Sequence, residues 1–325
     1  MNRRQFLAIP PALLAASLIP NNAEAAGGRL LFGYGRTGIG SKLALRALDI
    51  FEKHSIYPYL LENVPGRSTF NATDTFLAAA PDGLTILQTQ SPSLNMFPHI
   101  HSNISYDPLK DLRPLGILGE YTIALTLGPL VSKDVKNIDD FVEWVEENPE
   151  SRYIGFTQYG SPGHVAQLVL ARGKQVAIRP QAYRGTSMMI EDLLDGTLAA
   201  GMVITGNAIE KFQSGELRAI AVTSKYRHPG QGWGAVKTFN EQGIPSTNIS
   251  GWYGWFAPAD MADSLYRPLY YKVQKMLSDP KFREIQKEFS LKSVISYDTV
   301  ITQRIQNELE YYGDMVKEYR IGKVS

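Results

Sequence analysis

The sequence predicts an α/β fold of two successive units, because strand-like and helix-like segments alternate and the alternation restarts after residue 130. The chain has 325 residues, and at roughly 150 residues per domain this length suggests about two domains. Apolar residues make up 44% and charged residues 20% of the chain, so it can build a core and lacks the composition of a disordered protein.

Charge and cysteine content exclude several classes of function. Lys and Arg number 33 and Asp and Glu number 32, so no overall positive charge favours nucleic acid or an anionic membrane surface. Cys is missing, which excludes disulfides, thiolate metal sites, Cys nucleophiles and a lipid-modified N-terminal Cys. His99 and His101 lie close in sequence, but no further ligands can be named beside them, so we predict no metal site.

Residues 1–26 have the pattern of an export signal. Arg3 and Arg4 form a positive region, residues 6–19 are apolar, and Ala23-Glu24-Ala25 is a small-x-small cleavage site. The apolar stretch is shorter than the ~20 residues of a membrane-spanning helix, although a retained anchor is the alternative. Residues 2–7 partly match a twin-arginine signal, so ordinary and twin-arginine export both stay open. We expect a periplasmic protein that is cleaved near Ala25.

The first unit has the order strand, helix, strand, helix, strand. Apolar runs and helical spacing place these elements at residues 29–32, 41–54, 56–61, 71–80 and 84–87. Ser41 is the expected N-cap of the first helix. This order implies parallel strands in one sheet with helices on its faces.

The second unit follows residue 130 and leads into a helical tail. Its expected helices lie at 139–147, 164–172, 187–194 and near 208–213, and its strands at 153–156, 176–182, 198–204 and 217–222. A strand at 252–257 and helices at 264–277, 281–289 and 299–319 complete the chain.

Two glycine-containing turns open helices. Gly33-Tyr34-Gly35-Arg36-Thr37-Gly38 fits G-x-G-x-x-G, and Glu62 ends the next strand, so an exported dinucleotide-binding oxidoreductase is one open alternative. The broader interpretation is that backbone N–H groups at a helix N-terminus bind an anion, and Gly160-Ser161-Pro162-Gly163-His164 has the same character. Ser161 and His164 lack a G-x-S-x-G elbow and an acidic third member, so we predict no nucleophile there.

Three arginines follow strands. Arg36, Arg67 and Arg184 all lie in loops at the carboxyl ends of strands, which is the edge where open α/β sheets bind ligands. Guanidinium groups match carboxylates bidentately, so these side chains favour a carboxylate ligand. The alternative for each of them is a charge that faces water.

Several short stretches occur together in a characteristic order. They are Glu62-Asn63-Val64-Pro65-Gly66, Ala79-Ala80-Pro81-Asp82-Gly83-Leu84-Thr85-Ile86, Tyr106-Asp107-Pro108 with Asp111 and Pro114, Gly160-Ser161-Pro162-Gly163-His164, Tyr183-Arg184-Gly185, Asp192-Leu193-Leu194 with Gly196, Ser214-Gly215-Glu216-Leu217-Arg218-Ala219, Ala221-Val222-Thr223-Ser224 and Trp252-Tyr253-Gly254-Trp255-Phe256-Ala257-Pro258-Ala259. Through them the chain resembles the Bug family, the periplasmic TctC-type receptors of tripartite tricarboxylate transporters.

The resemblance implies a type II periplasmic binding-protein fold with two α/β lobes, a hinge and an interlobe cleft. Lobe 1 would comprise residues 27–125 and 252–325, and lobe 2 residues 126–251. The resemblance further implies a receptor and not an enzyme. Such a receptor would bind a small organic carboxylate without a cofactor, deliver it to a membrane permease or take part in sensing, and work as a monomer.

The candidate ligand-binding residues come from both lobes. They are Tyr34, Arg36, Thr37, Gly38, Ile39, Gly40, Ser41, Arg67, Ser68, Gln90, Ser91, Gly160, Ser161, Pro162, His164, Tyr183 and Arg184. The chain departs from the family pattern at several of these positions, with Gly35-Arg36 in place of two prolines, Ser41 in place of an Asp, Ser68-Thr69-Phe70 in place of a glycine pair and Asn, and Ala199 in place of another Asp.

These departures favour one kind of ligand. An ammonium group would need a carboxylate nearby, and the usual Asp is missing at Ser41, whereas Arg36 and Arg67 add partners for anions. We therefore expect a mono- or dicarboxylate without an amino group. Stacking of an aromatic acid on Tyr34, Phe70 and Tyr159 is the alternative.

Overall fold

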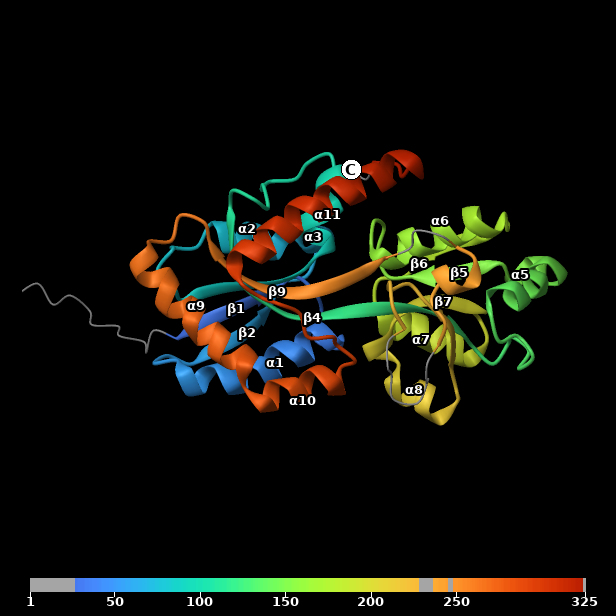
Figure 1. The fold of residues 1–325 in the computed structure, drawn as a ribbon, viewed down its shortest axis with the longest axis horizontal. Coiled ribbons are helices and arrows are strands. Elements are labelled where there is room, and N and C mark those ends of the chain that lie inside the picture. The colour runs from blue at the N-terminus through green and yellow to red at the C-terminus, as the bar shows by residue number, and fades with distance from the viewer. Residues whose placement is uncertain (1–26, 228–235, 245–247, 324–325) are drawn as a thin grey trace, which may run out of the picture.

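The computed structural model describes residues 27–227, 236–244 and 248–323. The predicted export signal lies outside the described residues. Figure 1 shows two α/β bodies side by side, joined across the middle by the long strands β4 and β9. No helix in the described part of the chain is long and apolar enough to cross a membrane.

The first body contains the predicted parallel sheet. Strand β1 (Gly28–Phe32) pairs in parallel with β2 (Tyr59–Asn63) and with β3 (Thr85–Gln90), so the parallel order expected from the sequence is confirmed. The helices between these strands are α1 (Ile39–Phe51) and α2 (Phe70–Leu77). Ser41 is not the N-cap of α1, because the helix begins two residues earlier and Gly38 is its N-cap.

Strand β4 (Leu112–Leu127) is not predicted by the sequence pattern. Its first part pairs antiparallel with β9 (Ser250–Pro258), and its last part pairs with β7 (Ala200–Ile204) and β8 (Arg218–Val222). One strand therefore belongs to the sheets of both bodies. All the strands form one path in the order β2-β1-β3-β9-β4-β7-β5-β6, with β8 on β4.

The second body repeats the α/β arrangement. Its parallel strands are β5 (Tyr153–Phe156), which matches its predicted range, and β6 (Arg179–Ala182), which begins later than expected, and β5 also pairs with β7. The helices of this body are α5 (Ile138–Glu147), α6 (Pro162–Lys174), α7 (Thr186–Asp195) and α8 (Ile209–Ser214). These helices turn apolar side chains onto the sheet and form its core.

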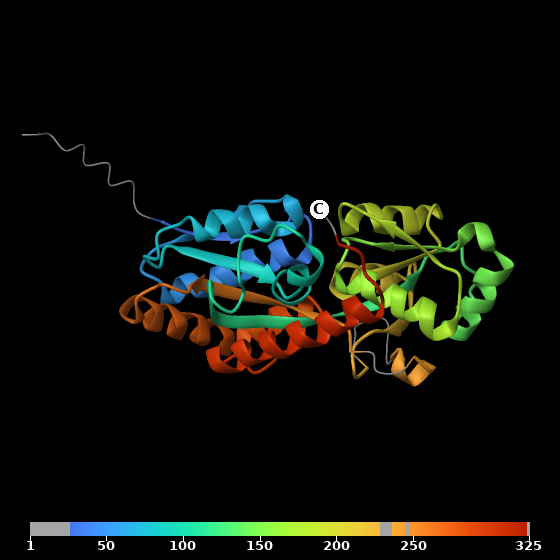
Figure 2. The same ribbon diagram turned by 90° about the horizontal axis from the view of Figure 1, so that it is seen from above.

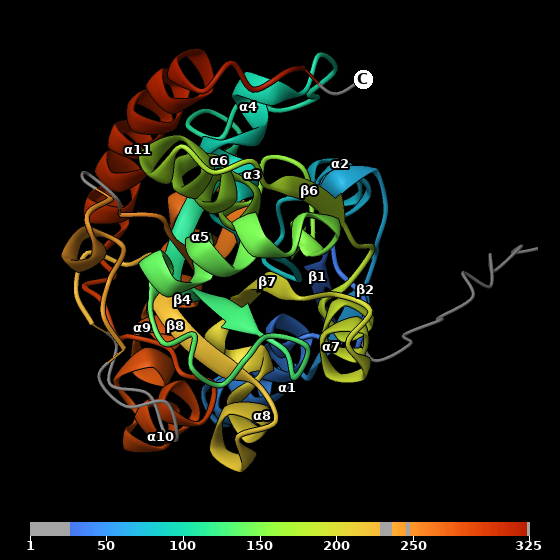
Figure 3. The ribbon, with the colours of Figure 1, turned by 90° about the vertical axis from the view of Figure 1, so that its right-hand side faces the viewer.

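The C-terminal helices pack on the first body. They are α9 (Asp263–Ser278), α10 (Pro280–Glu288) and α11 (Asp298–Glu318), and α11 also contacts the short helices α3 (Pro92–Asn95) and α4 (Phe97–Ile100). Figure 2 shows α11 running along the first body toward the second. Seen from the end of the second body, α11 lies on one side of the molecule and α7 on the other (Figure 3).

Candidate functional site

A cavity of about 180 Å³ lies between the two bodies. Nine of the predicted site residues lie in its wall: Tyr34, Thr37, Gly38, Ile39, Gly40, Gln90, Ser161, Pro162 and Arg184. The wall combines the turn before α1, the turn before α6 and the turn before α7 with side chains from β4 and β7. The structure thus brings together chain segments that are more than a hundred residues apart.

Three helix N-termini meet at this cavity. The N-caps of α1, α6 and α7 are Gly38, Ser161 and Gly185, and all three residues line the wall. None of these helices has an acidic residue in its first turn, whereas α5, α9 and α11 do. The Ile39 N–H of α1 donates to Asn207 and the His164 N–H of α6 to Ser161 Oγ, but each helix N-terminus still has a partial positive charge and no acidic side chain in its first turn, so the three together favour an anion.

The side chains of the wall have the same electrostatic preference. No Asp or Glu is among the described residues that line the cavity, and Arg184 is the basic side chain in the wall. Within the described ranges, Arg184 forms no ion pair with any carboxylate of the protein. A guanidinium group without a carboxylate partner is available to a bound acid.

Ser41 shapes the first turn without entering the cavity wall. It is buried, and its hydroxyl donates to the carbonyl oxygen of Gly35 at 2.9 Å and accepts from Asn63 Nδ2 at 2.8 Å. Asn63 also donates to the carbonyl oxygen of Tyr34 at 2.8 Å. The two side chains hold the turn in the conformation that places Gly38 and its neighbours at the cavity.

The two bodies already touch across the cavity. Tyr34 in the first body donates its hydroxyl proton to Gln158 Oε1 in the second at 3.2 Å. The backbone N–H of Ile39 donates to Asn207 Oδ1 at 3.2 Å. Burial raises the pKa of Tyr34 well above its usual value, so its hydroxyl stays a neutral donor.

His164 lies behind the wall as a neutral base. Its ring is buried and stacks on Phe156, with 4.8 Å between ring centroids, and its Nδ1 accepts from the N–H of Gly160 at 3.2 Å. Burial lowers the pKa of His164 to about 4. The ring is uncharged at neutral pH and lies outside the cavity wall, where its contact with Gly160 holds the turn before α6.

The three arginines predicted to bind the ligand do not all lie in the cavity wall. Arg67 pairs with Asp74 at 2.9 Å, and neither Arg67 nor Arg36 is among the residues that line the cavity with Arg184. Ser68 is also outside the wall, in a turn in which the four successive residues 66–69 have positive φ. Of the three guanidinium groups, that of Arg184 is the one in the wall of this cavity.

Three further predicted site residues, Ser91, Tyr183 and Gly160, make contacts within the protein outside the cavity wall. Ser91 Oγ accepts from the N–H of Trp252 at 3.2 Å, and Tyr183 donates to Asp192 at 2.7 Å, so both are positioning residues outside the wall. Gly160 has a φ of +71°, and a Cβ there would overlap the side chain of Ile100 in the first body. Only glycine fits this contact without strain.

The aromatic-acid alternative loses two of its three rings. Phe70 is buried against Phe97, His101 and Tyr106, and Tyr159 lies outside the wall, so of the three only Tyr34 faces the cavity. Glu62, which the dinucleotide alternative needs as a ribose ligand, is close to Arg29 at 3.6 Å and is absent from the wall.

Several wall residues were not predicted from the sequence. They are Phe32, Gly35, Pro92, Tyr121, Ile123, Thr157, Gln158, Gly163, Gly185, Thr186, Ser187, Met202, Ile204, Asn207 and Tyr253. The third turn, with Gly185 before α7, repeats the strand-turn-helix signal of the other two and could have been found from it. Tyr121 and Ile123 belong to β4, and without that strand no sequence signal places them.

Comparison with known proteins gives consistent matches along the chain. A family model described as "Tripartite tricarboxylate transporter family receptor" (TctC) matches residues 45–321. Protein BugT of Bordetella pertussis is 25% identical over 266 residues, which cover 80% of this chain and 79% of BugT. A protein of Cupriavidus necator, "UPF0065 protein in gbd 5'region", is 26% identical over 307 residues and covers 90% of each chain.

Solved structures share the fold. R. palustris Rpa4515 with adipate superposes with a TM-score of 0.84 at 19% identity, covering 92% of this chain and 98% of that one. The periplasmic binding protein BugD gives 0.81 at 20% identity, with 92% and 99% covered. MatC from Rhodopseudomonas palustris with bound malate gives 0.79 at 21% identity, with 89% and 98% covered. The predicted periplasmic binding-protein fold is confirmed.

Proposed function

Because this chain belongs to the tripartite tricarboxylate transporter receptor family, we propose that it is a periplasmic receptor for a small organic carboxylate. The favoured ligand is a mono- or dicarboxylate without an amino group. The family consists of solute receptors and not of enzymes, so the oxidoreductase alternative is set aside. The receptor would pass its ligand to a tripartite tricarboxylate-type permease or to a sensor.

One observation carries the choice of ligand class. The cavity wall joins three helix N-termini and Arg184, and no carboxylate is among the wall residues that the structure describes. An amino acid would bring an ammonium group into a site without a counter-charge, which costs free energy, whereas a carboxylate is stabilised from several sides. Rpa4515 with adipate and MatC with malate support the proposal, since both are complexes with dicarboxylates that have no amino group.

Cavity size supports a small ligand. At about 180 Å³ the space is smaller than the roughly 300–1,000 Å³ of sites for drug-sized molecules. Nucleotides and peptides are therefore disfavoured in this arrangement of the two bodies. Apolar side chains of Ile123, Met202 and Ile204 border the cavity, and they suit the carbon chain of an organic acid.

We further propose that the two bodies are the lobes expected from the sequence, residues 27–125 with 252–325 and residues 126–251. β4 and β9 cross between them, so a bend in these two strands would open the cleft. A ligand that contacts α1 on one lobe and α6 and α7 on the other favours the closed arrangement, because it binds that arrangement more tightly. Removal of residues 1–26 on export would leave the mature receptor in the periplasm.

Ligand screening by thermal shift tests the proposal directly. Purified protein is heated with adipate, malate and other organic acids, and in parallel with glutamate, glutamine and lysine. A ligand at about 100 times its Kd should add about 2.7 kcal/mol to the free energy of unfolding. Stabilisation by amino acids without a response to any organic acid would overturn the ligand class.

Two arginine variants separate a contact in the cleft from a general effect of charge. Arg184→Gln is expected to weaken binding of the best acid by about tenfold or more, since it removes a charge-assisted hydrogen bond. Arg36→Gln is the matched control, because Arg36 precedes the helix of the other lobe but is exposed outside the cavity wall. Equal affinities of the two variants, measured by titration calorimetry, would remove Arg184 from the site.

A further inference from the structure

A second cavity, of about 620 Å³, also has walls from both bodies. Side chains alternate between the two faces of a strand, and along β4 Ile123 lines the first cavity whereas Glu120 and Thr122 line the second. Tyr121 borders both. The second cavity therefore lies on the other face of β4 from the carboxylate site, and we name it the hinge groove.

The hinge groove collects positive charge from both bodies. Lys225 follows β8 in the second body, while Lys287 and Lys292 belong to the α10 region of the first. In the described part of the chain, none of these three ammonium groups has an ion pair with a carboxylate. Arg227 also lines the groove, but it is neutralised by Glu241 at 2.7 Å.

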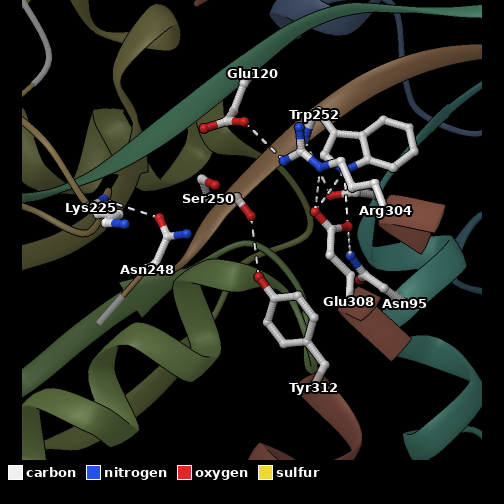
Figure 4. A network of polar contacts seen from close by, with 10 residues as sticks. Asn95, Glu120, Lys225, Asn248, Ser250, Trp252, Arg304, Glu308 and Tyr312 are labelled. Carbon is white, nitrogen blue, oxygen red and sulfur yellow. Dashed lines mark hydrogen bonds and ion pairs between the residues drawn. The ribbon is translucent and has the colours of Figure 1, made fainter. Parts of the chain in front are cut away.

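The carboxylate that lines the groove cannot neutralise the lysines. Glu120 is held by Arg304, whose Nη2 lies 2.9 Å from Glu120 Oε2. Arg304 also binds Glu308 at 2.6 Å, and Glu308 in turn accepts from Trp252 Nε1 at 3.0 Å. Figure 4 shows this network between β4, β9 and α11, with Asn95 as a further donor to Glu308. The negative charge of Glu120 is therefore neutralised by Arg304 and does not compensate the lysines.

The groove also contains apolar and aromatic surface. The Tyr226 ring has Lys225 Nζ at 5.3 Å and Lys292 Nζ at 5.8 Å from its centroid, so two cations from different bodies flank one ring. Buried Leu291 lies in the wall. Thr122, a wall residue that is fully buried, has a hydroxyl without a hydrogen-bond partner among the described residues.

We propose that the hinge groove is a second binding site, for an organic anion with an apolar or aromatic body. The lysines bind the anionic group, Tyr226 and Leu291 contact the carbon skeleton, and the larger volume admits molecules too big for the carboxylate cavity. The walls belong to different bodies, so the occupant stabilises the lobe orientation found in this structure. This site is separate from the proposed function of the first cavity.

Anilinonaphthalene sulfonate, a fluorescent aromatic anion, is a direct probe of the groove. Its fluorescence is titrated with the unaltered protein and with the variant Lys225→Gln/Lys287→Gln/Lys292→Gln. These lysines are exposed, so the folded state is expected to persist, and circular dichroism checks it. Loss of the cations should raise the Kd of the dye by about tenfold or more. A change of less than twofold would overturn the proposal.

Matched controls distinguish the groove from other sites. Lys53→Gln/Lys133→Gln/Lys281→Gln removes the same charge from exposed positions outside the groove and should leave the Kd within twofold. Arg184→Gln should also leave it within twofold, because Arg184 lines only the first cavity of the two. Dye binding lost with Arg184→Gln and kept with the groove variant would place the dye in the carboxylate cavity and refute the second site. The organic-acid titrations test the carboxylate site independently.

Discussion

Lowering the pH from 7 to 5 is expected to destabilise this protein by about 2 kcal/mol through His164 alone. Burial lowers the pKa of the His164 ring to about 4, whereas an unfolded His titrates near 6.5. Between these values the unfolded chain binds a proton that the folded protein does not bind. Stability is therefore complete above pH 6.5, falls as the pH drops toward 4, and is constant below it as far as this residue is concerned.

The magnitude follows from the two pKa values and from the geometry of the ring. Their difference corresponds to about 3 kcal/mol when protonation is complete and to about 2 kcal/mol at pH 5. Protonation also places an N–H on Nδ1, which now accepts from the N–H of Gly160, so two donors would face each other. Stacking on Phe156 keeps water from the ring.

Urea unfolding at pH 7, 6 and 5 measures the effect. The matched variant is His164→Gln, which retains an acceptor and cannot titrate. The unaltered protein should lose about 2 kcal/mol more than the variant between pH 7 and pH 5. Burial also lowers the pKa of His101, but that residue is present in both proteins and cancels in the difference. Parallel losses in the two proteins would refute the buried, neutral state of His164.

The remaining predictions concern the ion-pair network of Arg304, the turn at Gly160, and Arg67, which lies outside the cavity wall. Glu308→Gln should lower the free energy of unfolding by about 1–3 kcal/mol, because one of the two carboxylate partners of Arg304 is lost, and a urea titration that shows less than about 0.5 kcal/mol would contradict this. Gly160→Ala should weaken carboxylate binding, since its φ is +71° and the added methyl meets Ile100; unchanged affinity in calorimetry would argue against a close fit. Arg67→Ala should leave affinity within about twofold and stability within about 0.5 kcal/mol.

The local pattern of the sequence determined much of the candidate site. Glycine-containing turns between a strand and a helix predict anion-binding N-termini wherever they occur, because the free N–H groups belong to the helix itself. No acidic residue lies in the first turn of α1, where Ser41 stands in place of an Asp, and Ser161, expected in the loop before a helix at 164–172, is the N-cap of α6. Such features depend on a few neighbouring residues and need no knowledge of the fold.

The partners and surroundings of individual side chains depended on the tertiary fold. Arg67 and Arg184 follow strands in the same way, yet Arg67 finds Asp74 on the adjacent helix while Arg184 reaches the cavity. His164 is polar in sequence, but its surroundings in the second body make it a buried neutral base. The partners in each case lie on other elements, so no local pattern distinguishes them.

Strand β4 shows most clearly what a sequence pattern cannot predict. Pro114, Gly116 and Gly119 weaken its strand pattern, because proline removes a ladder donor and glycine has no side chain to pack. In the folded protein the space beside Gly116 is filled by Leu277, and that beside Gly119 by Leu291. The sequence by itself determined the α/β class and the glycine-containing turns before helices, since both follow from short-range periodicity and helix ends. Tertiary structure alone decided the strand that joins the two bodies, because the side chains that make its glycines necessary, Leu277 and Leu291, lie more than 150 residues further along the chain.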